Sequence, residues 1–536
     1  MAATPTPKTA ASTAAPSADA ASTETETPSS AAAAAERSPD PRRIAFVAAE
    51  VAGFAKTGGL ADVAAALPTH LHRRGHDVRV FMPFHGVIDR TKHRIVPVDF
   101  LQDLRISLGG RRYRARVFVT EVSTDGPSIY LIDCPSLFHR DGVYTGGEDD
   151  ALRFALLAQT VFLCCQHMGW APDILHGNDW HTALLPIYLR TLFGWDRLFA
   201  RTKTVLTIHN MAYQGVFPAS IVGAIGLGGV RDLLHQEDLQ GRGVINFMRT
   251  GLLYADAVTA VSETYAREIQ TAEHGHGLEG TVRARAGTVV GIVNGVDYGT
   301  WDPRHDPHLP RRYGLDDVGE GKFANKHALL SELAMPVDDL RGDDRSPPLL
   351  GIVSRMTAQK GFDLLFDVLP PLLRHTRTRL VALGSGADRY AGFFASLQRS
   401  FPSRVCYYNG YSELMAHRIE AAADIFLMPS RFEPCGLNQL YSLRYGTPPL
   451  VRRTGGLADT VRHFVRGSAA GETRGTGFVF DHFDPKGFAW ALGQALALYP
   501  DRPRWHRLRR NAMQQDYSWT RQGAIYERLY ATVLGG

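Results

Sequence analysis

The sequence predicts an α/β protein with two doubly wound domains that face one ligand-binding cleft. Three observations favour this fold class. Strands and helices of ordinary length alternate along nearly the whole chain, as in parallel sheets covered by helices on both faces. A glycine-rich turn between an apolar run and a helix occurs at residues 56–59 and returns at residues 454–456. Polar and glycine-rich segments follow directly after the predicted strands, where such sheets bind ligands.

The composition narrows the class of protein. A chain of 536 residues has room for two or three domains, and 44% hydrophobic residues suffice for large cores. The net charge of only +5, without a dense basic block, argues against a dedicated nucleic-acid binder. No apolar run reaches the roughly 18 residues of a membrane span. The five cysteines lack zinc-ligand spacing, which favours a reducing compartment and hence the cytoplasm.

Residues 1–40 consist mainly of alanine, serine, threonine and proline, with almost no large apolar side chain. Such a segment cannot bury enough surface to fold, so we expect a disordered tail. A plastid transit peptide is the alternative, because serine and alanine are abundant. Four acidic residues weigh against it: Asp19, Glu24, Glu26 and Glu36.

The first alternating series assigns residues 41–292 to an N-terminal domain. Its apolar runs predict strands at residues 44–49, 77–82, 112–120, 128–133, 173–175, 204–208 and 257–261. Helical patterns cover residues 60–74, 151–168, 182–193 and 245–254. The Asn294-Gly295 pair is a turn signal, and it places the crossing between domains at about residues 291–300.

The second alternating series assigns residues 300–515 to a C-terminal domain. Strands are expected at residues 350–353, 380–383, 405–408, 425–428 and 450–451. Helices are expected at residues 362–374, 414–423 and 437–445, and a last helix at residues 519–534.

The two glycine turns predict an anionic ligand between the domains. A strand, a turn and a helix in succession point backbone N–H groups at an anion, and Lys56 adds a positive charge beside Gly58 and Gly59. In the second copy Arg453 takes the place of Lys56 before Thr454. Either copy alone could be an ordinary tight turn. Two copies, each after a strand and beside a cation, indicate a shared negatively charged ligand.

Charged residues after two later strands suggest group transfer from a diphosphate. Arg355 and Lys360 could clamp a diphosphate and stabilise charge on a leaving group, while Gly361 permits close approach. The alternative is a surface pair flanking a helix. Glu433 could balance positive charge on a sugar carbon or hold a sugar hydroxyl, or serve only as a helix-dipole partner. Pro434 is expected in the first turn of the helix that follows.

The remaining candidates carry weaker signals. Asp179 and His181 flank Trp180 in a polar and aromatic cluster suited to sugar binding. His176 and His181 could suggest a metal, but no third ligand has the spacing for one. His209 could be a structural strand-end residue. Gly384, in a Gly-Ser-Gly string, could be a simple turn.

Taken together, the chain resembles bacterial-type glycogen synthases and plant starch synthases. These are retaining glucosyltransferases of the GT-B type, with two facing Rossmann-like domains and an active-site cleft between them. The resemblance runs from Arg43 to near the C-terminus. It rests on seven strings in order: Lys56 to Val63, Asp179 to His181, His209 to Gly215, Val293 to Asp297, Ser354 to Gly361, Pro429 to Gly436 and Arg453 to Asp459.

The resemblance implies transfer of glucose from ADP-glucose to the non-reducing end of an α-1,4-glucan such as glycogen. It implies an acceptor-binding N-terminal domain, a nucleotide-sugar-binding C-terminal domain, a helix at residues 516–536 that returns to the N-terminal domain, and no cofactor or metal. Carried over by position, the catalytic residues are Glu433, Arg355, Lys360, Asp179 and His209. The nucleotide-sugar contacts are Lys56, Gly58, Gly59, Asn294, Gly384, Tyr411, Cys435, Gly436, Leu437, Thr454, Gly455 and Gly456. The acceptor contacts are Asp62, His181 and Asn210.

Two positions depart from the family pattern, and three rival functions stay open. Asn178 stands where many bacterial members have histidine, and Phe138 stands where tyrosine is common.

A sucrose- or trehalose-forming transferase often has a second glutamate eight residues after the first, but that position is Tyr441 here. A phosphorylase would need a lysine site for pyridoxal phosphate, which is not evident. A non-catalytic glucan-binding scaffold is disfavoured because the three central charged residues are retained.

Overall fold

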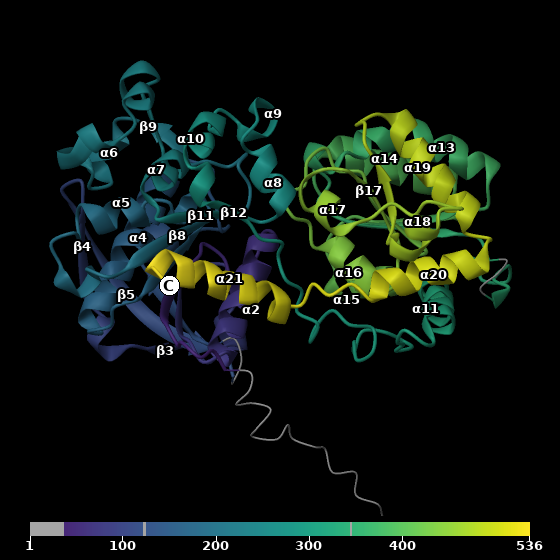
Figure 1. The fold of residues 1–536 in the computed structure, drawn as a ribbon, viewed down its shortest axis with the longest axis horizontal. Helices are drawn as coiled ribbons and strands as arrows, with labels where there is room; N and C mark the ends of the chain where they lie inside the picture. The colour runs from purple at the N-terminus through teal and green to yellow at the C-terminus, as the bar shows by residue number, and fades with distance from the viewer. Residues whose placement is uncertain (1–36, 122–124, 343–345) are drawn as a thin grey trace, which may run out of the picture.

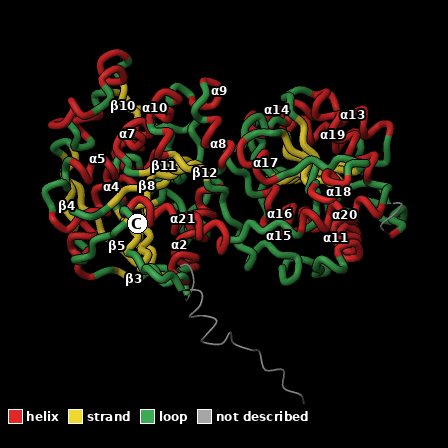
Figure 2. Tube along the Cα trace, in the orientation of Figure 1, coloured by secondary structure: helices red, strands yellow, loops and turns green. Residues whose placement is uncertain are grey.

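The chain forms two α/β units that lie side by side along the long axis of the molecule (Figure 1). The computed structural model describes residues 37–121, 125–342 and 346–536. Residues 1–36, which make up most of the predicted disordered tail, lie outside the described part. In both units strands run through the middle and helices surround them (Figure 2). Two doubly wound α/β domains, the predicted fold class, are therefore confirmed.

The N-terminal unit is built on a ten-stranded sheet in the order β12-β11-β8-β7-β1-β2-β6-β5-β3, with β4 paired to β5. The strands from β12 to β6 are parallel, and β3, β4 and β5 form an antiparallel edge. The strand bounds are β1 (Arg43–Val47), β2 (Asp77–Pro83), β3 (Val96–Pro97), β4 (Leu104–Leu108), β5 (Arg111–Glu121), β6 (Ser128–Asp133), β7 (Ile174–Asn178), β8 (Lys203–Ile208), β11 (Ala257–Ala260) and β12 (Val289–Gly291). A separate hairpin joins β9 (Val216–Pro218) to β10 (Val244–Asn246).

Helices cover both faces of this sheet because its central strands are apolar on both sides. In β1, Ala45 and Val47 join the core cluster beneath α4, whereas Ile44 and Phe46 join the cluster beneath α2. The helix bounds in this unit are α2 (Gly59–Arg73), α3 (Pro135–Phe138), α4 (Asp149–His167), α5 (Leu185–Arg190), α6 (Ile221–Ala224), α7 (Phe247–Tyr254), α8 (Glu263–Glu268), α9 (Ala272–Gly275) and α10 (Glu279–Ala284).

The C-terminal unit has a six-stranded, fully parallel sheet in the order β15-β14-β13-β16-β17-β18. Its strands are β13 (Leu349–Val353), β14 (Arg379–Leu383), β15 (Val405–Tyr408), β16 (Ile425–Met428), β17 (Pro449–Arg452) and β18 (Phe478–Phe480). Its helices are α11 (Val318–Glu332), α13 (Leu365–His375), α14 (Asp388–Ser400), α15 (Glu413–Ala422), α16 (Asn438–Arg444), α17 (Gly455–Thr460), α18 (Ala469–Arg474), α19 (Pro485–Leu498) and α20 (Arg502–Met513).

The last helix, α21 (Trp519–Leu534), lies against α2 of the N-terminal unit (Figure 1). Tyr526 and Tyr530 are fully buried in the core cluster beneath α2. The Tyr530 hydroxyl is 2.8 Å from Nδ1 of His176 in β7, and Glu527 pairs with Arg74 at 3.1 Å. These buried contacts fasten the end of the chain to the N-terminal unit.

Three predicted helices begin or end elsewhere for identifiable reasons. The helix expected at residues 182–193 is only Leu185–Arg190, with Pro186 in its first turn and a separate 3₁₀ turn at Trp180–Thr182. The helix expected at residues 245–254 begins at Phe247, because the Asn246 side chain caps the Arg249 amide and residues 244–246 pair as β10. The helix after Glu433 begins at Asn438, so Pro434 lies before it rather than in its first turn.

Among the described residues no helix combines the length and apolarity needed to cross a membrane. In the same part of the chain no group of three or more histidine, cysteine, aspartate or glutamate side chains is arranged to hold a metal ion. All five cysteines are free thiols, and Cys164 and Cys165 are buried in the core of the N-terminal unit.

Candidate active site

The first glycine turn joins β1 to α2 at the edge of the N-terminal unit. Helix α2 begins at Gly59 and has no side-chain cap, so its first amide hydrogens are available to an anion. The Lys56 ammonium lies 2.6 Å from the carboxylate of Asp62, which is in the first turn of α2. A Cβ atom on Gly59 would lie 3.4 Å from Leu437 of the C-terminal unit. The turn therefore lies where the two units meet.

A buried carboxylate that the sequence did not single out supports this turn. Glu50 is 3% exposed and accepts hydrogen bonds from the Thr57 amide, the Thr57 hydroxyl at 3.0 Å and the Tyr144 hydroxyl at 3.0 Å. Burial raises the pKa of Glu50. The sequence does contain a signal for Glu50, since it is the one acidic residue inside the apolar run of residues 44–52.

Asp179 directly follows β7 and lies at the carboxyl end of the sheet. Its φ angle is 56°, an uncommon value for a residue with a side chain. One carboxylate oxygen accepts the amide hydrogens of His209 at 2.8 Å and Asn210 at 3.3 Å. Burial raises the pKa of Asp179 to about 7. The structure thus brings three of the predicted residues into one hydrogen-bonded cluster.

His181 lies among aromatic side chains of the N-terminal unit. Its ring stacks on Tyr144 with centroids 4.7 Å apart and lies 4.1 Å from Trp180. It is 6% exposed, and its Nδ1 atom has no hydrogen-bond partner in the described part of the chain. His181 therefore packs beneath the Asp179 cluster, with one polar atom left for a ligand or a water molecule.

The C-terminal unit supplies the cations. Lys360 pairs with Glu433 at 2.7 Å, and the Ser430 hydroxyl donates to the same carboxylate oxygen at 2.9 Å. The exposed Arg355 side chain makes no hydrogen bond or ion pair with any other described residue. Gly361 has a φ angle of 71°, and a Cβ atom there would lie 1.9 Å from the Pro429 carbonyl oxygen. Only glycine fits at this position, which places Lys360 beside Glu433.

Three further predicted contacts line the same boundary. Tyr411 is 65% exposed and lies near Lys56. Asn294 is buried; its amide hydrogen points to the Cys435 sulfur at 3.4 Å, and its side-chain oxygen has no partner among the described residues. A Cβ atom added at Gly384 would lie 1.8 Å from the Ser354 carbonyl oxygen. Glycine at this position therefore allows the end of β14 to pass close to the segment that carries Arg355.

Two helices cap each other across the domain boundary. Glu268, at the end of α8, accepts hydrogen bonds from the Thr454 hydroxyl at 3.0 Å and the Gly455 amide at 3.0 and 3.1 Å. Asp459, in α17, accepts from the amide and hydroxyl of Thr264 at 2.8 and 2.5 Å. Each carboxylate lies at the N-terminal end of the other helix, where the helix dipole favours negative charge.

This cross-capping changes the expectation for the second glycine turn. The Gly455 amide is already bonded to Glu268, and the Gly456 amide lies 3.1 Å from the carbonyl oxygens of both Glu433 and Pro434. A phosphate group could bind the Gly455 amide only in exchange for Glu268. In this structure the turn supports the backbone of Glu433 through the Gly456 amide.

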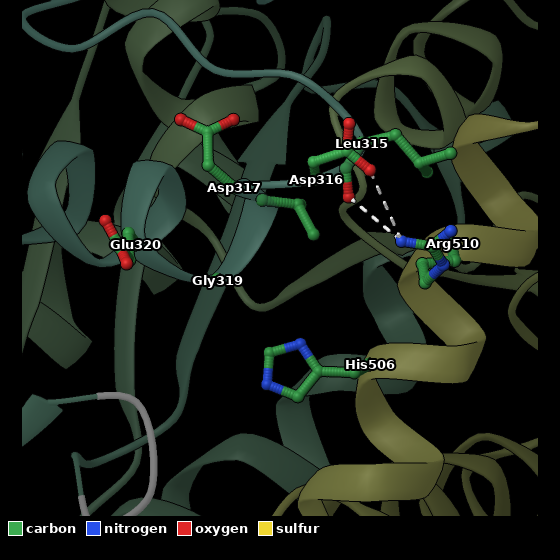
Figure 3. A pocket seen from close by; sticks show the side chains of 8 residues that line it. Leu315, Asp316, Asp317, Gly319, Glu320, His506 and Arg510 are labelled. Carbon is green, nitrogen blue, oxygen red and sulfur yellow. Dashed lines mark hydrogen bonds and ion pairs between the residues drawn. The ribbon is translucent and has the colours of Figure 1, made fainter.

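A cavity of about 320 Å³ lies elsewhere in the C-terminal unit, between the start of α11 and α20 (Figure 3). His506 and Arg510 project from α20 toward the acidic residues Asp316 and Glu320. None of the predicted site residues lines this cavity. The candidate active site is therefore the boundary between the units, where both sheets present their carboxyl ends.

Comparison with known proteins identifies the family. Residues 43–284 match the starch synthase catalytic domain, and residues 341–515 match the glycosyl transferases group 1 family. A glycogen synthase of Desulforudis audaxviator is 40% identical over 92% of this chain and 97% of the relative. One of Anaeromyxobacter dehalogenans is 44% identical over 92% of this chain and 100% of the relative. The chain belongs to the glycogen synthase family. It is therefore a glycosyltransferase.

Solved structures agree with this family assignment. The catalytic domain of starch synthase IV from Arabidopsis thaliana, bound to ADP and acarbose, superposes with a TM-score of 0.85 at 32% identity. The match covers 93% of this glycogen synthase family member and 100% of the plant domain. A sucrose-phosphate synthase from Thermosynechococcus elongatus, at 16% identity and a TM-score of 0.55, shares the fold alone.

Removing one of the cross-capping carboxylates is expected to destabilise this glycogen synthase family member. Glu268→Ala leaves the Thr454 and Gly455 donors without their acceptor, and a lost helix cap costs about 1 kcal/mol. We expect a lower midpoint of thermal unfolding, measured by scanning fluorimetry. Glu273→Ala is the control, because that carboxylate is 74% exposed and pairs with the neighbouring His274 at 3.8 Å rather than with the N-terminus of another helix. Equal midpoints for the two variants would contradict the role of Glu268.

Proposed function

We propose that the chain transfers glucose from ADP-glucose to the non-reducing end of an α-1,4-glucan, with retention of the α configuration. The observation that carries this proposal is that Lys360 and Glu433 pair at 2.7 Å in the unit whose Leu437 lies against Gly59, at the uncapped start of α2. Cations and free amides suit a diphosphate, and a carboxylate beside them suits a sugar carbon that becomes positive. Membership of the glycogen synthase family supplies the donor and acceptor classes.

We assign the diphosphate to groups from both units. Arg355 has an exposed guanidinium and Lys360 a partly exposed ammonium, so both can bind phosphate oxygens. The amide hydrogens at the start of α2 approach from the opposite side, beside Lys56. As the glycosidic bond to phosphate breaks, these groups stabilise the negative charge that develops on departing ADP.

The glucosyl group is assigned to the space between Glu433 and the Asp179 cluster. Lys360 and Ser430 hold Glu433, which fixes the position of its carboxylate. Its charge balances the positive charge that develops on the anomeric carbon. Asp179 and His209 offer hydrogen-bonding atoms from the acceptor side. Contact between the units excludes water, which favours transfer to a glucan over hydrolysis.

The structure disfavours the sucrose- or trehalose-forming alternative at one particular position. Tyr441, where those enzymes often carry a second glutamate, is buried and stacks on Trp301 with ring centroids 3.9 Å apart. A carboxylate there would break an aromatic contact in the core. The scaffold alternative is disfavoured because Arg355, Lys360 and Glu433 are all present and Lys360 and Glu433 are paired.

Glucose transfer to glycogen, with ADP-glucose and UDP-glucose supplied in parallel, tests the proposal directly. We expect strong turnover with ADP-glucose, and proton NMR of the new linkage should show the α configuration. A preference for UDP-glucose would overturn the donor assignment and keep the reaction. No transfer from either donor would overturn the proposed function.

Substitution of Tyr411 tests how the proposed site binds the nucleotide of ADP-glucose. We expect its exposed ring to stack on adenine, an interaction of roughly 1–3 kcal/mol. Tyr411→Ala should therefore raise the KM for ADP-glucose about tenfold and change kcat less than about twofold, as measured by initial rates. Tyr408→Ala is the matched control, since Tyr408 is also exposed, at 47%, but ends the preceding strand. Equal effects of the two substitutions would refute the assignment.

A further inference from the structure

Asn178 joins β1 to His209 through its side-chain amide. It is the last residue of β7 and is fully buried. Its Nδ2 atom donates to the Val47 carbonyl oxygen at 3.1 Å, and its Oδ1 atom lies 3.0 Å from His209 Nε2. A backbone carbonyl can only accept a hydrogen bond, so the amide nitrogen must face Val47. The amide oxygen therefore faces the imidazole ring.

This arrangement determines where the proton of His209 resides. An amide oxygen can only accept, so His209 Nε2 must carry the hydrogen. Burial lowers the pKa of His209 to about 3, which keeps the ring neutral with a single N–H. The other nitrogen, Nδ1, then has a free lone pair. It has no hydrogen-bond partner among the described residues, and protein atoms do not fully enclose it, so a ligand atom can reach it.

We propose that Asn178 is a positioning residue that holds His209 in the Nε2–H tautomer, so that Nδ1 accepts a hydrogen bond from a sugar hydroxyl. The sugar ligand rests on the proposed function, whereas the tautomer follows from the three protein groups alone. A hydroxyl that donates to Nδ1 keeps its own oxygen free for another donor. The tautomer thus determines which hydroxyl orientation the site accepts.

Several titratable groups surround His209, and any test must distinguish their titration from that of His209. The Asp179 carboxylate accepts the His209 backbone amide, and its pKa is raised to about 7. His176, on β7, has its pKa lowered to about 3, and that of His181 is lowered as well, so both are neutral. Glu50 interacts with Asp179 through charge. Because Asp179 titrates near neutrality, pH profiles of variants are best expressed as a ratio to the wild type.

Nitrogen-15 NMR of the histidine rings in the full chain tests the tautomer without any activity measurement. The His209 signals are assigned by their loss in His209→Gln. We expect the neutral Nε2–H form between pH 6 and pH 8. An Nδ1–H form, or an imidazolium, would overturn the proposal. This readout stands even if the chain does not transfer glucose, so failure of the proposed function and failure of the tautomer assignment are distinguishable.

Asn178→Asp tests the consequence for the reaction. The new carboxylate raises the pKa of His209, typically by 1–3 units, or donates its own proton to Nε2 at low pH. Either route places a hydrogen on Nδ1. We expect the ratio of kcat/KM, variant to wild type, to fall between pH 8 and pH 5, by up to about tenfold when the pKa of His209 rises by 3 units. A ratio that is constant over this range would overturn the proposal.

Asn246→Asp is the matched control. Asn246 is also buried in the N-terminal unit, where it caps α7 by accepting the Arg249 amide at 2.9 Å and donates to the Gln214 side-chain oxygen at 2.6 Å. Aspartate keeps the cap and loses the hydrogen bond to Gln214, so the folding of this control is checked by its midpoint of thermal unfolding. Its activity ratio should be constant from pH 8 to pH 5. If the Asn178 and Asn246 variants had the same pH dependence, a general effect of buried charge would replace the proposed role.

Discussion

Replacing Glu433 with glutamine is expected to lower kcat by about 10²–10³ while leaving the fold intact. Glutamine has the same shape and keeps an oxygen that can accept from Ser430 at 2.9 Å and Lys360 at 2.7 Å. It lacks the negative charge that balances the developing charge on the anomeric carbon. Because that charge develops only in the transition state, kcat and kcat/KM should fall together. Initial rates with ADP-glucose and glycogen measure both.

Glu420→Gln is the matched control for this experiment. Glu420 lies in the same domain, is 1% exposed and accepts the Ser442 hydroxyl at 2.7 Å. Burial raises the pKa of Glu420 to about 8, so the group is mainly protonated at neutral pH and glutamine resembles it closely. Turnover of this variant should equal that of the wild type. Near-normal turnover of the Glu433→Gln enzyme would show that Glu433 is not a catalytic residue.

Replacing Asp179 with asparagine is expected to abolish transfer and to stabilise the protein at high pH. The folded-state pKa of about 7 lies above the ordinary value of 3.8, because burial disfavours the charged form. Well below pH 3.8 both states are protonated, and the group does not affect stability. As pH rises to 7, the unfolded state ionises first, and the native state loses about 4 kcal/mol of relative stability. Asparagine removes this loss and still accepts the His209 and Asn210 amides.

Thermal unfolding measured from pH 4 to pH 8 tests whether ionisation of Asp179 destabilises the native state. The midpoint of Asp179→Asn should equal that of the wild type near pH 4 and exceed it by several degrees at pH 8. Asp133→Asn is the control. That aspartate is 1% exposed and paired with Arg116 at 2.5 Å, so its loss should lower the midpoint at pH 8. A lower midpoint for Asp179→Asn at pH 8 would show that its ionisation stabilises the native state.

The sequence by itself determined the architecture, because local patterns carry that information. Apolar runs and helical periodicity depend on near neighbours, and they located most strands and long helices of both sheets. The rule that ligands bind at the carboxyl ends of parallel strands then selected Lys56, Asp179, Arg355 and Glu433 without knowledge of any contact. The strands β12 and β18 were not predicted, because their apolar runs of three residues show no period that distinguishes them from a loop.

Only the tertiary structure decided which of these residues meet and in which state of charge. Lys360 and Glu433 pair across 73 positions of the chain, and Glu268 caps Gly455 across 187. The role of Glu50, the tautomer of His209 and the raised pKa of Asp179 likewise depend on burial by distant segments. Burial and pairing are properties of the packed chain, because desolvation and hydrogen bonding depend on distances in space that sequence spacing does not encode.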